Sequence, residues 1–147
     1  MGVILDSSVV IGAERAGLTP ADLIRQTMAQ LGDRPVALSA IGYAEVAHGI
    51  YRAKSEKQRQ ARRLFVEGLL AQLGVYPFTR EAAELAARIG AEAVTAGNAV
   101  PVADLFIGAT ALSLGYAVLT SNDRHFRLVP GLTVISFKQR ASTGPKE

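Results

Sequence analysis

Five short extended segments recur along the chain and are separated by helix-like stretches. They lie at residues 3–5, 36–38, 75–78, 117–120 and 133–137, and most are strongly apolar. Strands that alternate with helices form parallel sheets, because each parallel crossover needs a helix to return the chain. The order therefore predicts an α/β domain with a mostly parallel central sheet and helices on both faces. Pro77 keeps the third segment away from the centre of the sheet.

Helix signals fill the intervals between these segments. Ser7 and Ser8 follow the first strand and are placed to cap a helix. The apolar spacing of residues 56–73, with Leu64 on the buried side, predicts one long helix. The other helices are predicted at residues 20–31, after Ser39, from Thr79 to about Gly97, and at residues 102–114.

Length and composition bound the class of protein. The 147 residues, 49% of them hydrophobic, fit one compact domain, which we place at residues 1–138. The polar segment 139–147 is expected to fray. The absence of cysteine excludes disulfides, zinc–thiolate sites and a cysteine nucleophile, and suits a reducing compartment. We find no secretory signal and no apolar segment long enough to span a bilayer, and so expect a cytoplasmic protein.

The net charge of +3 and the sequence pI of about 9.5 are compatible with a polyanionic partner. Six basic residues fall close together and are called the basic cluster here: Arg52, Lys54, Lys57, Arg59, Arg62 and Arg63. This cluster is either a solvated helix face or a surface that contacts phosphates or a partner.

Four of the thirteen acidic residues do not fit the polar face of a predicted helix. Asp6 ends the first strand, and Glu45 lies about one turn into the helix after the second. Asp104 is the only charge in a long apolar run, and Asp123 follows the strand AVLT. Because parallel strands share one carboxyl edge, these four acids are expected to meet in one cleft.

Each acid also has a separate structural explanation. Asp6 can cap a helix, and Asp104 can stabilise a helix macrodipole from the first turn. Glu45 can pair with His48 one turn further on. Asp123 can form an Asx-turn. Convergence replaces these four explanations with one.

Carboxylates packed together repel each other, so some stay protonated unless a cation neutralises them. Hard oxygen ligands of this kind select Mg²⁺ or Mn²⁺. Such a metal activates water and offsets charge on a phosphoryl oxygen. The pattern therefore predicts metal-dependent phosphodiester hydrolysis without a histidine or cysteine nucleophile, and we interpret His48 and His125 as structural or groove-lining.

Four motifs resemble those of the PIN-domain ribonucleases, especially the VapC toxins of bacterial toxin–antitoxin pairs. They are ILDSSVVIG, SAIGYAEVAHGI, PVADLFIGATAL and VLTSNDRHFRLVPGL, in the family's order and at about its spacing. The resemblance implies a three-layer α/β/α fold, an Mg²⁺ site that Mn²⁺ can also fill, and endonucleolytic cleavage of RNA. Asp6 and Asp104 would be the main metal ligands. Glu45 would be a third acid that binds the metal directly or through water.

The last motif departs from the family pattern. The family has Thr and, two positions later, Asn or Asp; here Thr120 is followed by Asn122, with Asp123 one residue further on. The resemblance implies that Asn122 or Asp123 lines the site and that Thr120 holds the turn or contacts phosphate. Arg124, Arg127 and the basic cluster are the candidates for flanking the RNA.

The resemblance also implies partners. Toxins of this kind form homodimers and are held inactive by a VapB-type antitoxin, a segment of which fills the active-site groove and often places a basic side chain against the acids.

Two other functions compete with this one. A receiver-like signalling module also binds Mg²⁺ at strand ends, and Thr120 and Lys138 superficially fit it, but it needs paired acids near the first strand, where only Asp6 stands. A PIN-fold nuclease that processes RNA without an antitoxin is the second.

Overall fold

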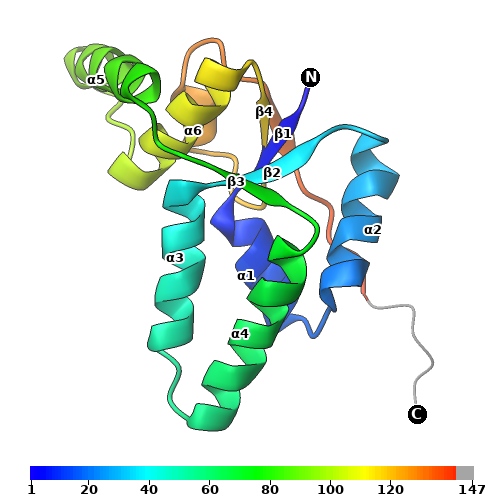
Figure 1. Ribbon diagram of the computed structural model, residues 1–147. Helices are drawn as coiled ribbons and strands as arrows, with labels where there is room; N and C mark the ends of the chain where they lie inside the picture. Colours follow the sequence, from blue (N-terminus) through cyan, green and yellow to red (C-terminus); the bar gives the residue numbers. More distant parts are fainter. Residues whose placement is uncertain (142–147) are drawn as a thin grey trace.

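Five parallel strands form the single sheet of the computed structural model, which describes residues 1–141 (Figure 1). The strands are β1 (Val3–Leu5), β2 (Val36–Ser39), β3 (Gly74–Tyr76), β4 (Ala117–Thr120) and β5 (Val134–Ser136). Their order is β3-β2-β1-β4-β5, and every neighbouring pair is parallel. The predicted parallel α/β sheet is confirmed. Its order differs from the 2-1-3-4-5 order of receiver-type folds.

Six helices and one 3₁₀ turn connect the strands. They are α1 (Ser7–Arg15), α2 (Pro20–Leu31), α3 (Ala40–Tyr51), α4 (Glu56–Leu70), α5 (Arg80–Thr95), α6 (Val102–Leu114) and η1 (Phe126–Leu128). Thr19 begins α2 with a capping box that it forms with Asp22, and Gly115, at a φ of 68°, ends α6 in the left-handed conformation that lets the chain turn into β4.

Alternating side chains of the strands build a core on each face of the sheet. Val3 and Leu5 pack with α1, α2 and α4 on one face, together with the inner side of α3. Ile4 points to the other face and packs against α6 and η1. Helices thus cover both faces, which confirms the three-layer α/β/α fold.

Three local expectations are wrong: the caps of α1, the end of α4 and the burial of Leu64. Ser7 and Ser8 are the first two residues of α1 and not its caps, because Asp6 occupies the cap position. Helix α4 ends at Leu70, short of residue 73, and Leu64 is 60% exposed on its outer side. Pro77 does follow an edge strand, as expected, since β3 pairs only with β2.

The C-terminal segment is bonded to α2 further than the sequence suggests. Gln30 accepts from the Lys138 backbone N–H (3.1 Å), and Gln26 both donates to and accepts from the backbone of Arg140 (2.7 and 2.9 Å). The expected frayed tail therefore does not begin at residue 139, and its last six residues, 142–147, lie outside the described part. Within residues 1–141 no helix has the length and apolar character needed to cross a membrane.

Candidate active site

Asp6 lies at the carboxyl edge of the sheet, between the central strands β1 and β4. Its backbone N–H donates to the Leu119 carbonyl (2.9 Å), which continues the β1–β4 pairing. Its carboxylate is buried, and Oδ2 accepts from Ser8 Oγ (2.6 Å) and Thr120 Oγ1 (2.8 Å). Oδ1 accepts no hydrogen bond from residues 1–141. No polar side-chain atom in that part is both buried and unpartnered, so Oδ1 keeps contact with solvent.

The same hydroxyl groups position the loop after β4. Ser8 Oγ accepts from the Ser121 backbone N–H (3.1 Å), and Thr120 Oγ1 accepts from that of Asn122 (2.9 Å). Thr120 is fully buried. Its contacts show it holding both the turn and Asp6, and the two hydroxyl groups fix Asp6 Oδ2 while Oδ1 stays in contact with solvent.

Glu45 reaches the same edge from the first part of α3. Its Oε1 accepts from Ser7 Oγ (2.9 Å), and no ion pair joins it to His48 in the part of the chain that the structure describes. Burial raises the pKa of Glu45, and the negative charges of Asp6 and Asp104 raise it further, against the lowering effect of the Ser7 hydrogen bond. The three carboxylates are close enough to act on one another.

Asp104 completes this group from the first turn of α6. Its Oδ2 lies 3.0 Å from His125 Nδ1, and its side chain is 24% exposed. Burial raises the pKa of Asp104, and the charge of Asp6 adds to that, while the hydrogen bond and charge of His125 lower it. Asp6, Glu45 and Asp104 are called the acidic cluster below.

Asp123 does not join the acidic cluster, contrary to expectation. Its Oδ2 accepts from Ser136 Oγ (2.9 Å) at the end of β5 and from Arg127 Nε (3.0 Å). These donors, Ser136 first, lower the pKa of Asp123. The side chains of Asn122 and Arg124 are exposed. The prediction that four acids converge is therefore wrong for Asp123, which instead stabilises the connection between β4 and β5.

His125 is the residue of this loop that meets the acidic cluster, with its Nδ1 3.0 Å from Asp104 Oδ2. This agrees with the prediction that His125 is structural or groove-lining, but its contact with Asp104 was not predicted. The available signal was Phe126, which is 1% exposed and anchors η1, so that the preceding side chain is held in a fixed direction.

The donor set of the acidic cluster fits a hard divalent cation. Mg²⁺ binds through one or two carboxylates and keeps several waters, so it needs no complete cage of side chains. Asp6 supplies a solvent-facing oxygen, and Asp104 is the next carboxylate to it across the edge. Within residues 1–141 no three carboxylate or imidazole groups form a ready-made metal cage. The arrangement fits a site completed by water and by substrate oxygens.

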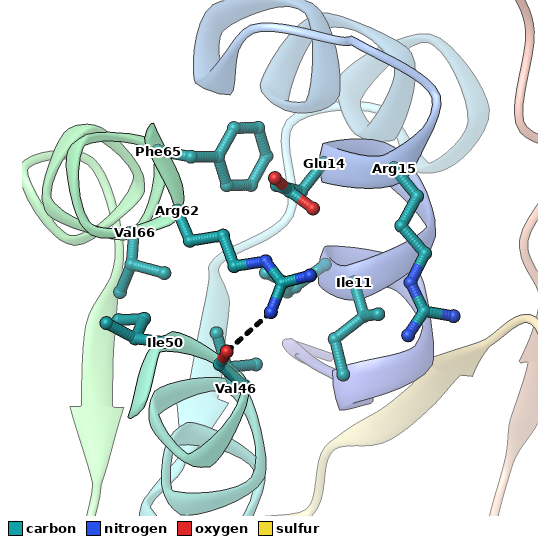
Figure 2. Close-up of a pocket in the computed structure, with 10 residues that line it drawn as sticks. Ile11, Glu14, Arg15, Val46, Ile50, Arg62, Phe65 and Val66 are labelled. Carbon is teal, nitrogen blue, oxygen red and sulfur yellow. Dashed lines mark hydrogen bonds between the residues drawn. The ribbon is translucent and has the colours of Figure 1, made fainter. Parts of the chain in front are cut away.

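A groove of about 70 Å³ lies between α1, α3 and α4 (Figure 2). Figure 2 shows Arg62 pointing across it, where the guanidinium donates to the Gly49 carbonyl of α3 (2.7 Å). Most of the residues that line it are apolar, and three of them, Glu14, Arg15 and Arg62, are charged. The full lining consists of Val10, Ile11, Glu14, Arg15, Val46, Gly49, Ile50, Arg62, Phe65 and Val66. The acidic cluster does not line this groove, which forms a separate surface.

Comparison with known proteins agrees with this architecture. The PIN-domain family model matches residues 3–132. The ribonuclease VapC of Rickettsia bellii (strain RML369-C) is 30% identical over 136 residues, which cover 92% of this chain and 96% of that protein. The tRNA(fMet)-specific endonuclease VapC of Salmonella typhimurium is 29% identical over 99 residues, 67% of this chain and 73% of that protein.

A solved structure of a similar protein has the same fold. The DNA-bound VapBC structure from Salmonella typhimurium has a chain that is 25% identical to this one, with a TM-score of 0.78, over 94% of this chain and 99% of that one. The fold, the family match and the relatives agree with the four motifs: this chain belongs to the PIN-domain family, as a member of its VapC type.

Proposed function

We propose that this chain is an Mg²⁺-dependent endoribonuclease and the toxin of a VapBC-type pair. The observation that carries the proposal is the acidic cluster: the pKa values of Glu45 and Asp104 are raised, and no lysine or arginine of the described residues forms an ion pair with a carboxylate of the cluster. Such a cluster favours a bound cation. The relatives named ribonuclease or endonuclease support RNA as the substrate.

Each residue of the acidic cluster has its own role in the proposed reaction. Asp6 and Asp104 would hold the metal, through Asp6 Oδ1 and the Asp104 carboxylate. The metal would supply a lowered pKa for bound water and positive charge for a phosphoryl oxygen. Glu45, whose pKa is raised, stands where a carboxylate can orient the attacking water and take its proton. Mn²⁺ has the same ligand preference and would substitute.

A VapB-type antitoxin is the proposed partner, and the cytoplasm is the proposed compartment. The VapBC structures among the similar proteins support the partner. The groove between α1, α3 and α4 is the apolar surface best placed for an antitoxin segment, since α1 and α3 both begin at the edge that carries the acidic cluster. We also propose a homodimer, as the family resemblance implies.

The test uses purified protein freed of any antitoxin. The protein is incubated with total RNA in Mg²⁺ or in EDTA, beside the Asp104→Asn variant. Discrete RNA fragments that need both the metal and Asp104 are the expected result. Intact RNA in every sample, with Mg²⁺ binding shown by calorimetry, would overturn the ribonuclease proposal. Cleavage by a protein that no product of a neighbouring gene inhibits would support a PIN nuclease without an antitoxin instead.

A further inference from the structure

The structure divides the basic cluster into two halves. Three members have partners: Arg59 pairs with Glu56 (2.6 Å), Arg62 donates to the Gly49 carbonyl (2.7 Å), and the Arg63 guanidinium lies 5.6 Å from the centre of the Tyr51 ring. The other three, Arg52, Lys54 and Lys57, are exposed, and their side chains make no hydrogen bond or ion pair with residues 1–141. The side chains of these three residues therefore stabilise no contact within residues 1–141.

The unpaired half lies at the turn between α3 and α4, residues 51–57, which is called the α3–α4 tip here. Figure 1 shows α3 running away from the sheet and meeting α4 at this far end. Glu45, His48 and Arg52 stand at positions i, i+3 and i+7, so they share one side of α3. Seven residues of helix rise about 10 Å, so the tip begins only a short distance from the acidic cluster along that side.

An exposed aromatic ring accompanies these charges. Tyr51 is 68% exposed, although a side chain of its size is usually more buried. Arg63 covers part of the ring and orients it. A positively charged path with an aromatic ring on which a base can stack is how proteins bind single-stranded nucleic acid.

The acids near the tip do not cancel its charge. Glu56 is already paired with Arg59. Glu67 lies eleven residues later on α4, roughly 16 Å along the axis. The tip therefore presents a net positive charge, which suits a polyanion better than a neutral or basic protein segment.

We infer that the α3–α4 tip is a second RNA-binding surface, which holds the strand after it leaves the acidic cluster along α3. The inference rests on the proposed function and narrows its substrate class. The RNA would carry a single-stranded loop or tail that spans the cluster and the tip together. Arg52, Lys54 and Lys57 contact its phosphates, and Tyr51 stacks on a base.

The first test measures RNA binding in EDTA, so that no cleavage occurs. The probe is a fluorescently labelled single-stranded RNA of about 20 nucleotides, longer than most single-module binding sites. The test double variant is Arg52→Ala with Lys54→Ala. The matched control is Arg34→Ala with Arg88→Ala, which removes the same charge from two exposed residues away from the tip.

The expected result separates charge at the tip from charge in general. Removing two phosphate contacts lowers the slope of log Kd against log salt by about 1.4 and raises the Kd on the order of tenfold at low salt. The control double keeps the wild-type slope. Thermal melting of both variants checks that the fold is intact.

A second pair of variants tests the ring. Tyr51→Ala is expected to raise the Kd about fivefold or more, because a stacked base loses its partner. Tyr51→Phe keeps the ring and is expected to bind like the wild type.

A test double that matches its control in Kd and slope overturns the inference. Wild-type RNA binding together with loss of binding to the product of a neighbouring gene would assign the tip to a protein partner and overturn it as well. Cleavage in Mg²⁺, measured separately, decides the proposed function: a protein that cleaves RNA yet shows no effect of the tip fails only the second proposal.

Discussion

Asp104 and Asp123 both stand near the carboxyl edge of the sheet, yet their surroundings act on them in opposite directions. The Asp104 side chain is 24% exposed, and its burial and the negative charge of Asp6 raise its pKa against the opposing effect of His125. The Asp123 side chain is 38% exposed and accepts from Ser136 and Arg127, which lower its pKa. Burial and like charge dominate at Asp104, whereas hydrogen-bond donors dominate at Asp123.

This contrast teaches how to recognise an acid that is available for a cation. A carboxylate whose lone pairs are filled by donors has a structural role, here the closure of the β4–β5 connection. A carboxylate that burial and like charges oppose is unfavourable in the metal-free protein and gains most from a bound cation. By this criterion Asp104 belongs to the site and Asp123 does not, although the sequence presents both as acids near strand ends.

The largest expected effect comes from exchanging one acid for its amide. Asp104→Asn is expected to lower the rate of RNA cleavage by on the order of 10³-fold, because the proposed metal ligand loses its charge. Asp123→Asn is expected to stay within about threefold of the wild type, as for a surface substitution. Single-turnover cleavage of total RNA in Mg²⁺ measures both. Equal losses in the two variants would refute the distinction between the two acids.

A smaller effect is expected from His125, which holds Asp104 Oδ2. His125→Leu is expected to cost about 10-fold to 100-fold in cleavage rate, the range for groups that orient a metal ligand. His125→Asn retains an N–H donor and is expected to recover part of that loss. Arg127→Leu in the same loop is the matched control, since it weakens only the Asp123 pair. A His125→Leu variant as active as the control would show that Asp104 needs no support.

The smallest effect is in stability, and it has opposite signs for the two acids. A raised pKa means that the folded state binds the proton more tightly than the unfolded chain does. The stability tied to protonated Asp104 and Glu45 is therefore complete below their ordinary pKa values and is lost as pH rises through the raised ones. Asp123 behaves inversely: its contribution is present above its ordinary pKa and is lost as pH falls through the lowered one.

Melting curves in EDTA measure this difference. Near pH 7 Asp104→Asn is expected to raise the melting temperature of the metal-free protein, and Asp123→Asn to lower it. Both differences are expected to shrink as the pH falls: that of Asp104→Asn once the pH is below its raised pKa, and that of Asp123→Asn only when the pH falls through its lowered pKa. A fall in melting temperature for Asp104→Asn near pH 7 would contradict the repulsion within the acidic cluster.

Much of the fold could be predicted because its signals are local. Helices α2 and α6 span the predicted residues 20–31 and 102–114. The errors occur where a distant partner decides. Ser8 was expected to cap α1, but Thr120, 112 positions away, shares Asp6 Oδ2 with it. Leu64 fits the apolar spacing of α4 and still faces solvent, since no element within residues 1–141 covers it.

The candidate site could be predicted only as far as strand ends indicate it. Asp6, Glu45 and Asp104 come together because the parallel sheet gathers the ends of β1 and β2 and the start of α6. The loop after β4 follows no such rule. Asp123 and His125 are two residues apart, and which of them meets Asp104 depends on Ser136 in β5 and on the anchoring of η1. No pattern within the loop itself specifies that choice.

The order of the strands has a consequence for the synthesis of this protein. Asp6 leaves the ribosome early. Asp104, and Thr120, whose hydroxyl donates to Asp6, are added after most of the chain has been made. A chain that terminates before residue 104 thus lacks both Asp104 and Thr120, two of the residues that surround Asp6. A nuclease assembled in this way gains its site only when translation of its own message is nearly complete, so incomplete products of that message lack the means to cut RNA.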